Sequence, residues 1–260
     1  MAKKDKLTPN ELALTAKRLG DAIKGTPFQD HVFIVGVAVR DYYLKTDIKD
    51  IDIAVELPNG GIAFGEYISK KMGSPHAIVT YPKYGTCKFT IDIKDVGEVD
   101  FEAVQCRKEW YTEGSRKPSK IAVGNMREDA HRRDLTINAL YLDVSTMSVF
   151  DPTTKGYGDL KNHILSCPAD AEKTFKDDPL RMLRVIRFKT KLGWDVDKNT
   201  WMGIIENAHE IENVSKERIN DELTKILLCD KPSEGIRALL RCNLLGYVLP
   251  DIYNMVGITQ

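Results

Sequence analysis

The pattern of apolar and polar residues changes near residue 150 of the chain. Before that point, β-branched or alternating apolar runs bounded by Gly, Pro or Asp are typical of strands, and they cover residues 31–35, 51–57, 87–93 and 99–106. After it, apolar residues recur at spacings of three and four, which predicts helices over residues 179–192, 200–211, 216–228 and 233–245. The fold class expected is α+β: a head with a sheet, followed by an all-helical extension.

Composition places the chain among soluble globular proteins. With 260 residues, 42% of them hydrophobic and 29% charged, it can bury a core in one large domain or two small ones. No apolar run approaches the roughly 18 residues needed to cross a bilayer, and none follows the charged start MAKKDKLT. We therefore expect a cytoplasmic protein without a membrane partner.

The cysteines argue against a disulfide framework or a zinc site. There are five of them, an odd number, widely spaced and without a C-x-x-C pair. We expect buried thiols at all five positions, which are Cys87, Cys106, Cys167, Cys229 and Cys242.

The formal net charge of zero hides three basic clusters. Five basic and no acidic residues lie between Arg181 and Lys191, and the other clusters are RKPSK at 116–120 and HRR at 131–133. Each cluster alone is most simply a solvated surface. Together they favour a polyanionic partner only if the fold brings them to one place.

Two carboxylates lie one residue apart in the apolar run KDIDIAV, at Asp50 and Asp52. In a strand these side chains share a face, with Cα atoms about 6.6 Å apart, and they repel each other unless a cation lies between them. Mg²⁺ prefers such carboxylates together with the phosphates of a nucleotide. Asp100 and Glu102 repeat the spacing, so neighbouring strands would gather a third carboxylate, an arrangement suited to two metal ions at a phosphoryl-transfer centre.

The stretch HVFIVGVAVRD indicates a strand, a tight turn at Gly36 and the start of a helix. A helix N-terminus after such a turn offers backbone N–H groups to an anion. Arg40 is placed to bind phosphate, and the alternative is an ordinary surface ion pair with Asp41.

Six segments resemble, in order, the motifs of the class II tRNA nucleotidyltransferase and bacterial poly(A) polymerase family: FIVGVAVRDYYL, KDIDIA, VDFEAVQCRKEWY, EDAHRRDLTINAL, FKDDPLRMLRVIRF and SKERINDEL. The resemblance implies a polymerase-β-like nucleotidyltransferase head with a mixed sheet, followed by a helical neck and body. We expect an N-terminal helical extension (1–30), the catalytic head (31–150), a neck that recognises the base (151–230) and the start of a body (231–260). The chain would then be truncated, or a compact version without most of the tRNA-binding tail.

The resemblance also implies roles for individual residues. Asp50 and Asp52 would bind Mg²⁺, and Glu102 would be the third catalytic carboxylate. Arg40 and Arg133 would hold the triphosphate and the sugar. The full set expected to bind the nucleotide is Gly36, Val37, Arg40, Arg133, Asp134, Asn138, Asp178, Arg181, Arg184 and Arg187.

Asp178 and Arg181 have a chemistry that suits base recognition. Asp178 before Pro179 is a good helix N-cap, and Arg181, three residues on, shares its helix face. A carboxylate accepts and a guanidinium donates, which matches the amino group and unprotonated ring nitrogen of cytosine or adenine. Uracil and guanine would leave mismatched buried groups, at about 1 to 3 kcal/mol each.

Two positions depart from the family pattern. Val37 stands where a second glycine is usual, and Asp177 stands where Glu usually precedes the base-reading Asp. For Arg184 and Arg187 the alternatives are a solvated face and phosphate contact, of which the resemblance favours the second.

The expected activity is addition of C and A residues to the 3′ end of tRNA from CTP and ATP, with release of pyrophosphate and without a template. A poly(A) polymerase or a partial CCA-adding enzyme shares every motif and stays open. A non-catalytic RNA-binding relative is a further alternative. A small-molecule nucleotidyltransferase would lack the DDPLR helix. The oligomeric state is left open by the sequence.

Overall fold

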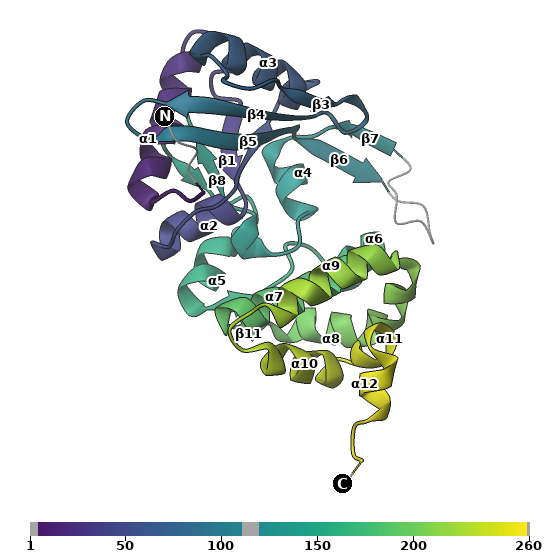
Figure 1. Cartoon of the computed structure of the whole chain (residues 1–260). Coiled ribbons are helices and arrows are strands. Elements are labelled where there is room, and N and C mark those ends of the chain that lie inside the picture. The colour runs from purple at the N-terminus through teal and green to yellow at the C-terminus, as the bar shows by residue number, and fades with distance from the viewer. Residues whose placement is uncertain (1–4, 111–119, 259–260) are drawn as a thin grey trace. The chain divides into compact units, whose positions relative to one another are not determined.

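The computed structural model describes residues 5–110 and 120–258 of the chain (Figure 1). It divides into two compact units. The head unit comprises Met1–Lys108, Ile121–His131 and Ile137–Tyr157. The helical unit comprises Glu109–Lys120, Arg132–Thr136 and Gly158–Gln260.

The head unit is built on a seven-stranded mixed sheet. Only β2 and β5 run parallel among the described strand pairs of this sheet; the other neighbours are antiparallel. In order across the sheet the strands are β3 (Val79–Tyr81), β4 (Thr86–Ile93), β5 (Gly97–Gln105), β2 (Ile51–Val55), β1 (Val32–Val35), β8 (Tyr141–Asp143) and β9 (Val149–Phe150). The four strands expected from the sequence are β1, β2, β4 and β5. The expected mixed-sheet head is thus confirmed.

Four helices accompany this sheet: α1 (Pro9–Ile23), α2 (Val37–Leu44), α3 (Gly60–Met72) and α4 (Met126–His131). α1 begins at a capping box, in which Thr8 and Glu11 each accept the other's backbone N–H. A short 3₁₀ turn, η1 (Pro82–Tyr84), links β3 to β4, and another, η2, spans Thr136–Asn138. A separate two-stranded sheet joins β6 (Arg107–Trp110) to β7 (Lys120–Val123).

α3 packs directly against one face of β4 and β5 (Figure 1). Its approach is close because Gly61 has no side chain: a Cβ there would lie 2.3 Å from the carbonyl oxygen of Gly85 and 2.6 Å from that of Ala103. A Cβ on Gly65 of α3 would lie 2.4 Å from Cys87 Sγ, and Cys87 is the register partner of Ala103, so both side chains face α3. Since successive strand residues alternate between faces, Glu102 points to the opposite face.

That opposite face is apolar at one end and polar at the other. The apolar end is a buried cluster of Phe33, Val35, Ala54, Cys106, Ala130, Ala139 and Tyr141. Tyr141 also donates a hydrogen bond of 2.6 Å to the buried carboxylate of Asp129 on α4. The polar end carries the carboxylates of β2 and β5, because Asp52 has the same parity as Ala54 on β2.

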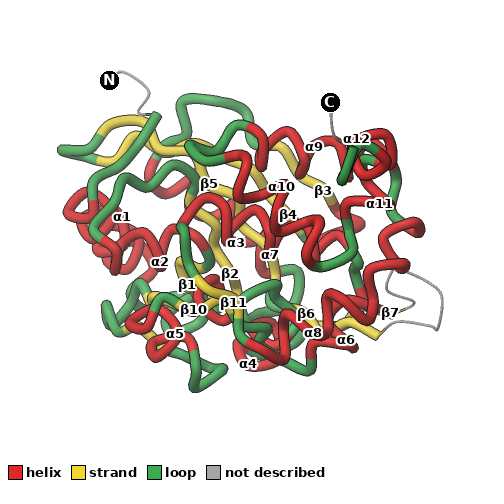
Figure 2. The backbone as a smooth tube through the Cα atoms, turned by 90° about the horizontal axis from the view of Figure 1, so that it is seen from below, coloured by secondary structure: helices red, strands yellow, loops and turns green. Residues whose placement is uncertain are grey.

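The described part of the helical unit after residue 157 is mainly helical and includes the short strands β10 (Ile164–Leu165) and β11 (Asp195–Val196) (Figure 2). Its helices are α5 (Gly156–Asn162, whose first two residues belong to the head unit), α6 (Ala171–Asp177), α7 (Leu180–Leu192), α8 (Lys198–Asn207), the 3₁₀ helix η3 (Ala208–Asn213), α9 (Lys216–Leu227), α10 (Pro232–Arg241), α11 (Leu245–Val248) and α12 (Pro250–Asn254). α7 packs against α9 and α10, and α6 packs against α8.

The expectation of an all-helical extension is wrong in one detail. β10 and β11 form a short parallel pair. Two residues per strand are too few to give a period-2 signal in the sequence.

The thiols are described at all five cysteine positions, and none forms a disulfide. Four are buried, whereas Cys229 is partly exposed, so the expectation of a buried thiol is wrong there. Burial raises the pKa of Cys167 and of Cys242 to about 12, which keeps both thiols protonated and inert at neutral pH. No helix within the described residues is long and apolar enough to cross a membrane.

Candidate active site

The carboxylates predicted from the sequence lie together on one sheet face. In the parallel pairing of β2 and β5, the Cα partner of Asp52 is Glu102. Paired residues in register point to the same side of a sheet. Asp50, which lies just before β2, lines the same cavity as Asp52 and Glu102. The expectation that the Glu102 strand lies beside the Asp52 strand is therefore confirmed.

The sequence positions these groups by alternation. Ile51 and Ile53 on β2 and Phe101 and Ala103 on β5 are buried, which fixes the facing of both strands. The intervening Asp52 and Glu102 are only partly buried. A shift of one residue in either strand would place a carboxylate in the core, so the register is strongly specified.

An open cavity of about 690 Å³ lies over this polar face. Its polar lining comprises Asp50, Asp52, Asp100, Glu102, Lys88 and His76. Thr90 also lines it, and its hydroxyl donates to Asp100 Oδ1 at 2.7 Å. The cavity thus presents several carboxylates to solvent in one concave place.

Lys88, a residue that the sequence did not single out, forms an ion pair with Glu102. Its Nζ lies 2.9 Å from Glu102 Oε2. The hydrogen bond and charge of Glu102 raise the pKa of Lys88 above its ordinary value, and Asp52 adds to the effect. The pairing depends on the register of β4 and β5, in which Lys88 and Glu102 are partners.

The donor set suits a hard divalent cation. Carboxylate oxygens are the ligands that Mg²⁺ prefers, and Asp50, Asp52 and Glu102 all line the cavity. Within the described residues, no three His, Cys, Asp or Glu side chains are gathered closely enough to hold an ion. Glu102 instead accepts the ammonium of Lys88. The chemistry of the donors fits a metal ion, while Glu102 would need to exchange its present partner.

The turn before α2 has the conformation that its glycine suggests. Gly36 has φ +76°, a value that L side chains rarely adopt. It is the N-cap residue of α2 without a side-chain cap, and Val37 is the first helical residue. The N-terminus of α2 therefore offers backbone N–H groups next to the end of β1.

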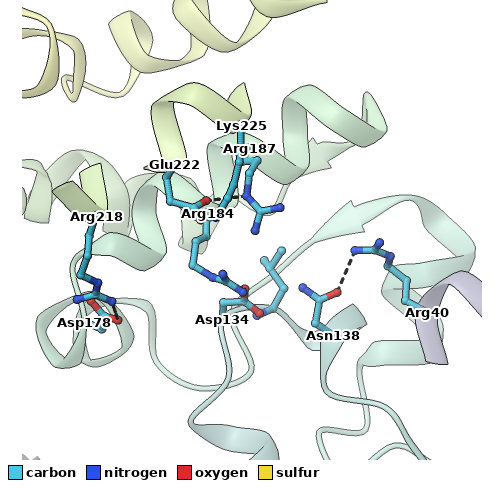
Figure 3. A network of polar contacts seen from close by, with 10 residues as sticks. Arg40, Asp134, Asn138, Asp178, Arg184, Arg187, Arg218, Glu222 and Lys225 are labelled. Carbon is cyan, nitrogen blue, oxygen red and sulfur yellow. Dashed lines mark hydrogen bonds and ion pairs between the residues drawn. The ribbon is translucent and has the colours of Figure 1, made fainter. Parts of the chain in front are cut away.

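Arg40 is fully buried, so the alternative of a surface ion pair with Asp41 is wrong. Its guanidinium donates to Asp41 Oδ1 at 2.6 and 2.8 Å. It also donates to Asn138 Oδ1 at 3.1 Å (Figure 3). The fold thus joins Arg40 and Asn138, two residues of the predicted nucleotide set that are 98 positions apart. Sequence spacing alone gives no sign of this contact.

In the helical unit, Asp134 pairs with Arg184 on α7. Arg184 Nη2 lies 2.6 Å from Asp134 Oδ2, and its Nε donates to the same oxygen at 2.8 Å (Figure 3). Asp134 Oδ1 accepts the backbone N–H of Leu135 at 2.8 Å. The charge of Asp134 raises the pKa of Arg184 against the opposing effect of burial. Arg133, next to Asp134, is half-buried.

Arg187, one turn further along α7, pairs with Glu222 on α9. Its Nε donates to Glu222 Oε2 at 2.6 Å, while Lys225 Nζ donates to Oε1 at 2.9 Å (Figure 3). Glu222 is only 3% exposed. The alternative of a solvated face for Arg184 and Arg187 is therefore wrong, because both guanidinium groups are paired and partly or largely buried.

Asp178 caps the start of α7 with its side chain, as expected, although the N-cap position itself is occupied by Pro179. Asp178 is the C-cap of α6, and α7 begins at Leu180 after Pro179. The Asp178 side chain accepts the Leu180 N–H through Oδ1 at 3.3 Å. Oδ2 accepts from Arg218 of α9 at 2.9 Å (Figure 3). Two helices meet at this residue, where the sequence suggested one helix start.

Arg181 is buried, and its Nη1 donates to the carbonyl oxygen of Thr174 at 3.1 Å. The side chains of Asp178 and Arg181 therefore form their described hydrogen bonds with other groups, and not with each other. Arg218 and Glu222, which the sequence did not assign to the site, both lie in the segment SKERINDEL. That motif was recognised, and its charged residues at spacings of four were the available signal.

The basic clusters differ in what the structure describes. RKPSK at 116–120 lies outside the residues whose side chains are described. HRR at 131–133 is divided, since His131 belongs to the head unit and Arg132 and Arg133 to the helical unit. In the cluster on α7, Arg184 and Arg187 are held by carboxylates.

The mixed sheet with register-paired carboxylates and a glycine-initiated helix defines a nucleotidyltransferase head. The family described as "Poly A polymerase head domain" matches residues 32–166. The family described as "Probable RNA and SrmB- binding site of polymerase A" matches residues 193–255. The chain therefore belongs to the class II tRNA nucleotidyltransferase and bacterial poly(A) polymerase family.

Individual relatives agree with this membership. The mitochondrial CCA tRNA nucleotidyltransferase of Candida glabrata is 36% identical over 230 residues, covering 81% of this chain and 42% of the relative. A CCA-adding enzyme of Limosilactobacillus reuteri is 35% identical over 218 residues, covering 83% and 50%. The crystal structure of the Bacillus stearothermophilus CCA-adding enzyme in complex with CTP has a TM-score of 0.69 and 27% identity, covering 91% and 53%. The chain spans about half the length of the curated relatives it matches.

Proposed function

We propose that the protein adds C and A residues to the 3′ end of tRNA from CTP and ATP, without a template and with release of pyrophosphate. The observation that carries the proposal is the register pairing of Asp52 with Glu102, with Asp50 beside them, over an open cavity. Relatives of this chain are named for CCA addition, and a neighbouring structure is named as a complex with CTP.

The nucleotidyltransferase family generally needs a divalent metal ion, and we propose Mg²⁺ held by Asp50 and Asp52. Bound there, the ion would lower the pKa of the attacking RNA 3′-hydroxyl and neutralise charge at the α-phosphate. The side chain of Glu102 supplies a third carboxylate on the same face of the sheet. The open cavity leaves room for the triphosphate beside these oxygens.

The chain's own donors position the nucleotide in this proposal. The N-terminus of α2, at Gly36 and Val37, offers N–H groups to a phosphate. Arg40 and Arg133 hold the triphosphate and the sugar. Because Arg40 is fully buried and donates to Asp41 in this structure, it reaches a phosphate only by exchanging that carboxylate for it. Asn138 accepts from Arg40 and so fixes the direction of its guanidinium. Asp134 likewise fixes the direction of the Arg184 guanidinium. Arg184 and Arg187 contact phosphate when a phosphate oxygen replaces their present carboxylate partners, Asp134 and Glu222.

Base choice falls to Asp178 and Arg181 in this proposal. Asp178 accepts from the amino group of cytosine or adenine, and Arg181 donates to the adjacent ring nitrogen. Their present partners are Leu180 N–H, Arg218 and the Thr174 carbonyl. These contacts orient both groups, so a base needs to replace only part of an existing set of hydrogen bonds.

RNA would be held mainly through its backbone by basic side chains, so binding weakens as salt increases. A poly(A) polymerase or partial CCA-adding activity is the second candidate, favoured by the name of the matching head-domain family. Cytoplasmic localisation stays a prediction.

The test is incubation of the purified protein with Mg²⁺, a tRNA lacking its 3′ end, and each labelled nucleotide alone and in pairs. Addition of C, C and A that then stops supports the proposal. A long A tail supports the poly(A) alternative instead. Intact nucleotide binding without incorporation would overturn the enzymatic proposal and leave an RNA-binding relative.

A further inference from the structure

Lys88, Glu102 and Asp52 form a row across three neighbouring strands of the head sheet. Lys88 on β4 is the register partner of Glu102 on β5, and Glu102 is the register partner of Asp52 on β2. All three line the same cavity. The ammonium of Lys88 therefore lies at one end of the row of carboxylates. The pairing of β4 with β5 sets this position, without a bound ligand.

The ammonium of Lys88 already satisfies a carboxylate that the metal would need. Its Nζ lies 2.9 Å from Glu102 Oε2, and both side chains are partly exposed, at 53% and 40%. An ammonium and a divalent cation repel each other, so they cannot both lie close to Glu102 at low cost. Because the pair is exposed, its energy is small, and the ammonium can move away when something better is offered.

We propose that Lys88 is an exchangeable counter-cation that competes with the divalent metal for Glu102 until a nucleotide arrives. The proposal rests on the carboxylate roles given under Proposed function. Phosphate oxygens in the cavity would give the displaced ammonium a new acceptor. The metal and the nucleotide are then coupled: each binds better when the other is present, by the same factor.

The test measures Mn²⁺ binding to the full chain by titration calorimetry, first without nucleotide and then with a non-hydrolysable CTP analogue. Lys88→Met removes the charge and keeps the length of the stem. We expect this variant to bind Mn²⁺ about three- to tenfold more tightly than the wild type without nucleotide, a modest factor because the pair is exposed. With the analogue bound, the difference should shrink or vanish.

Three variants serve as controls. Lys83→Met removes a charge from the adjacent η1 turn, where Lys83 Nζ lies 5.8 Å from the ring centroid of Tyr84, and it should leave Mn²⁺ affinity unchanged. Lys88→Arg keeps the charge and should bind as the wild type does. Asp52→Ala should lose the binding.

The outcomes separate the two proposals. The role of Lys88 is overturned if Lys88→Met binds Mn²⁺ no more tightly than the wild type, or if Lys83→Met gains affinity equally. In that case, loss of Mn²⁺ binding in Asp52→Ala still supports the metal assignment. Full Mn²⁺ binding by Asp52→Ala overturns the carboxylate roles themselves. A gain confined to Lys88→Met supports the counter-cation even if no tRNA extension is observed.

Discussion

Asp52 and Glu102 are direct partners in the one parallel strand pair described in the head sheet, that of β2 and β5. Parallel neighbours present side chains to the same face at the same height, so two carboxylates that are 50 residues apart in the chain converge without help from a loop. The convergence is a property of the sheet and should survive substitution of either side chain.

Asp52→Ala should therefore abolish nucleotide incorporation while leaving the fold intact. We expect kcat to fall by about 10³-fold, the range found when one group that stabilises transition-state charge is lost, with an unchanged circular dichroism spectrum and melting temperature. Asp92→Ala is the matched control, because Asp92 is an exposed carboxylate on β4 outside the cavity lining. Residual activity above a tenth of the wild type would remove the metal assignment.

Arg181→Ala should relax base choice. Loss of a donor that reads the ring nitrogen should reduce the ratio of kcat/KM for CTP over UTP by about 10- to 100-fold. The substitution also leaves the Thr174 carbonyl without this donor, so a thermal melt must accompany the kinetics. Arg237→Ala removes an exposed guanidinium paired with Glu234. It should change neither the CTP/UTP ratio of kcat/KM nor the melting temperature. Unchanged discrimination against UTP in a folded Arg181 variant would refute the base-reading role.

Glu222→Gln should destabilise the helical unit. It removes the charge that Arg187 and Lys225 share, and we expect a loss of about 2 to 3 kcal/mol in the free energy of unfolding. Glu234→Gln breaks an exposed ion pair and should cost under about 1 kcal/mol. Equal effects in denaturant titrations of the two variants would contradict this account.

The same carboxylate predicts a pH dependence. Burial acts to raise the pKa of Glu222, but Arg187 and Lys225 outweigh it, and the folded pKa lies below its ordinary value. A lowered folded pKa stabilises the native state above the unfolded pKa, about 4.3 for Glu, and this stabilisation is lost as pH falls through the folded value. Unfolding measured below about pH 4.5 should depend less steeply on pH in Glu222→Gln than in the wild type.

Gly61→Ala should disturb the packing of α3 on the sheet. The added Cβ would meet two backbone carbonyls, neither of which can move independently, so we expect a loss of about 2 to 3 kcal/mol in the free energy of unfolding. Gly158→Ala in α5 meets nothing within 4 Å and should be neutral or stabilising by up to about 1 kcal/mol. Similar melting temperatures for the two variants would argue against the close approach.

Local patterns in the sequence predicted the strands that carry the site, because alternation at Ile51 to Ile53 and at Phe101 to Ala103 reports a half-buried sheet directly. They also predicted the turn at Gly36, whose positive φ costs glycine less conformational free energy than other residues. α3 was not predicted: its glycines at 60, 61 and 65 weaken the helical signal, although they are what allows the close packing.

Contacts between distant segments could not be predicted from spacing. Arg40 donates to Asn138, which is 98 positions away, and Asp178 accepts from Arg218 on another helix. Lys88 could not be predicted for the same reason, because it meets Glu102 only when β4 and β5 pair in register. Family resemblance named the residues of the site, but not the partners that hold them.

Arg132–Thr136 belongs to the helical unit although the segments on both sides of it belong to the head unit. Asp134, at its centre, pairs with Arg184, fifty residues later in the chain. A ribosome that has delivered the head unit through Tyr157 has therefore not yet delivered the guanidinium that Asp134 needs. During synthesis the ion pair between Asp134 and Arg184 can therefore form only after α7 has emerged, whereas domains generally begin to fold as units while the chain is being made.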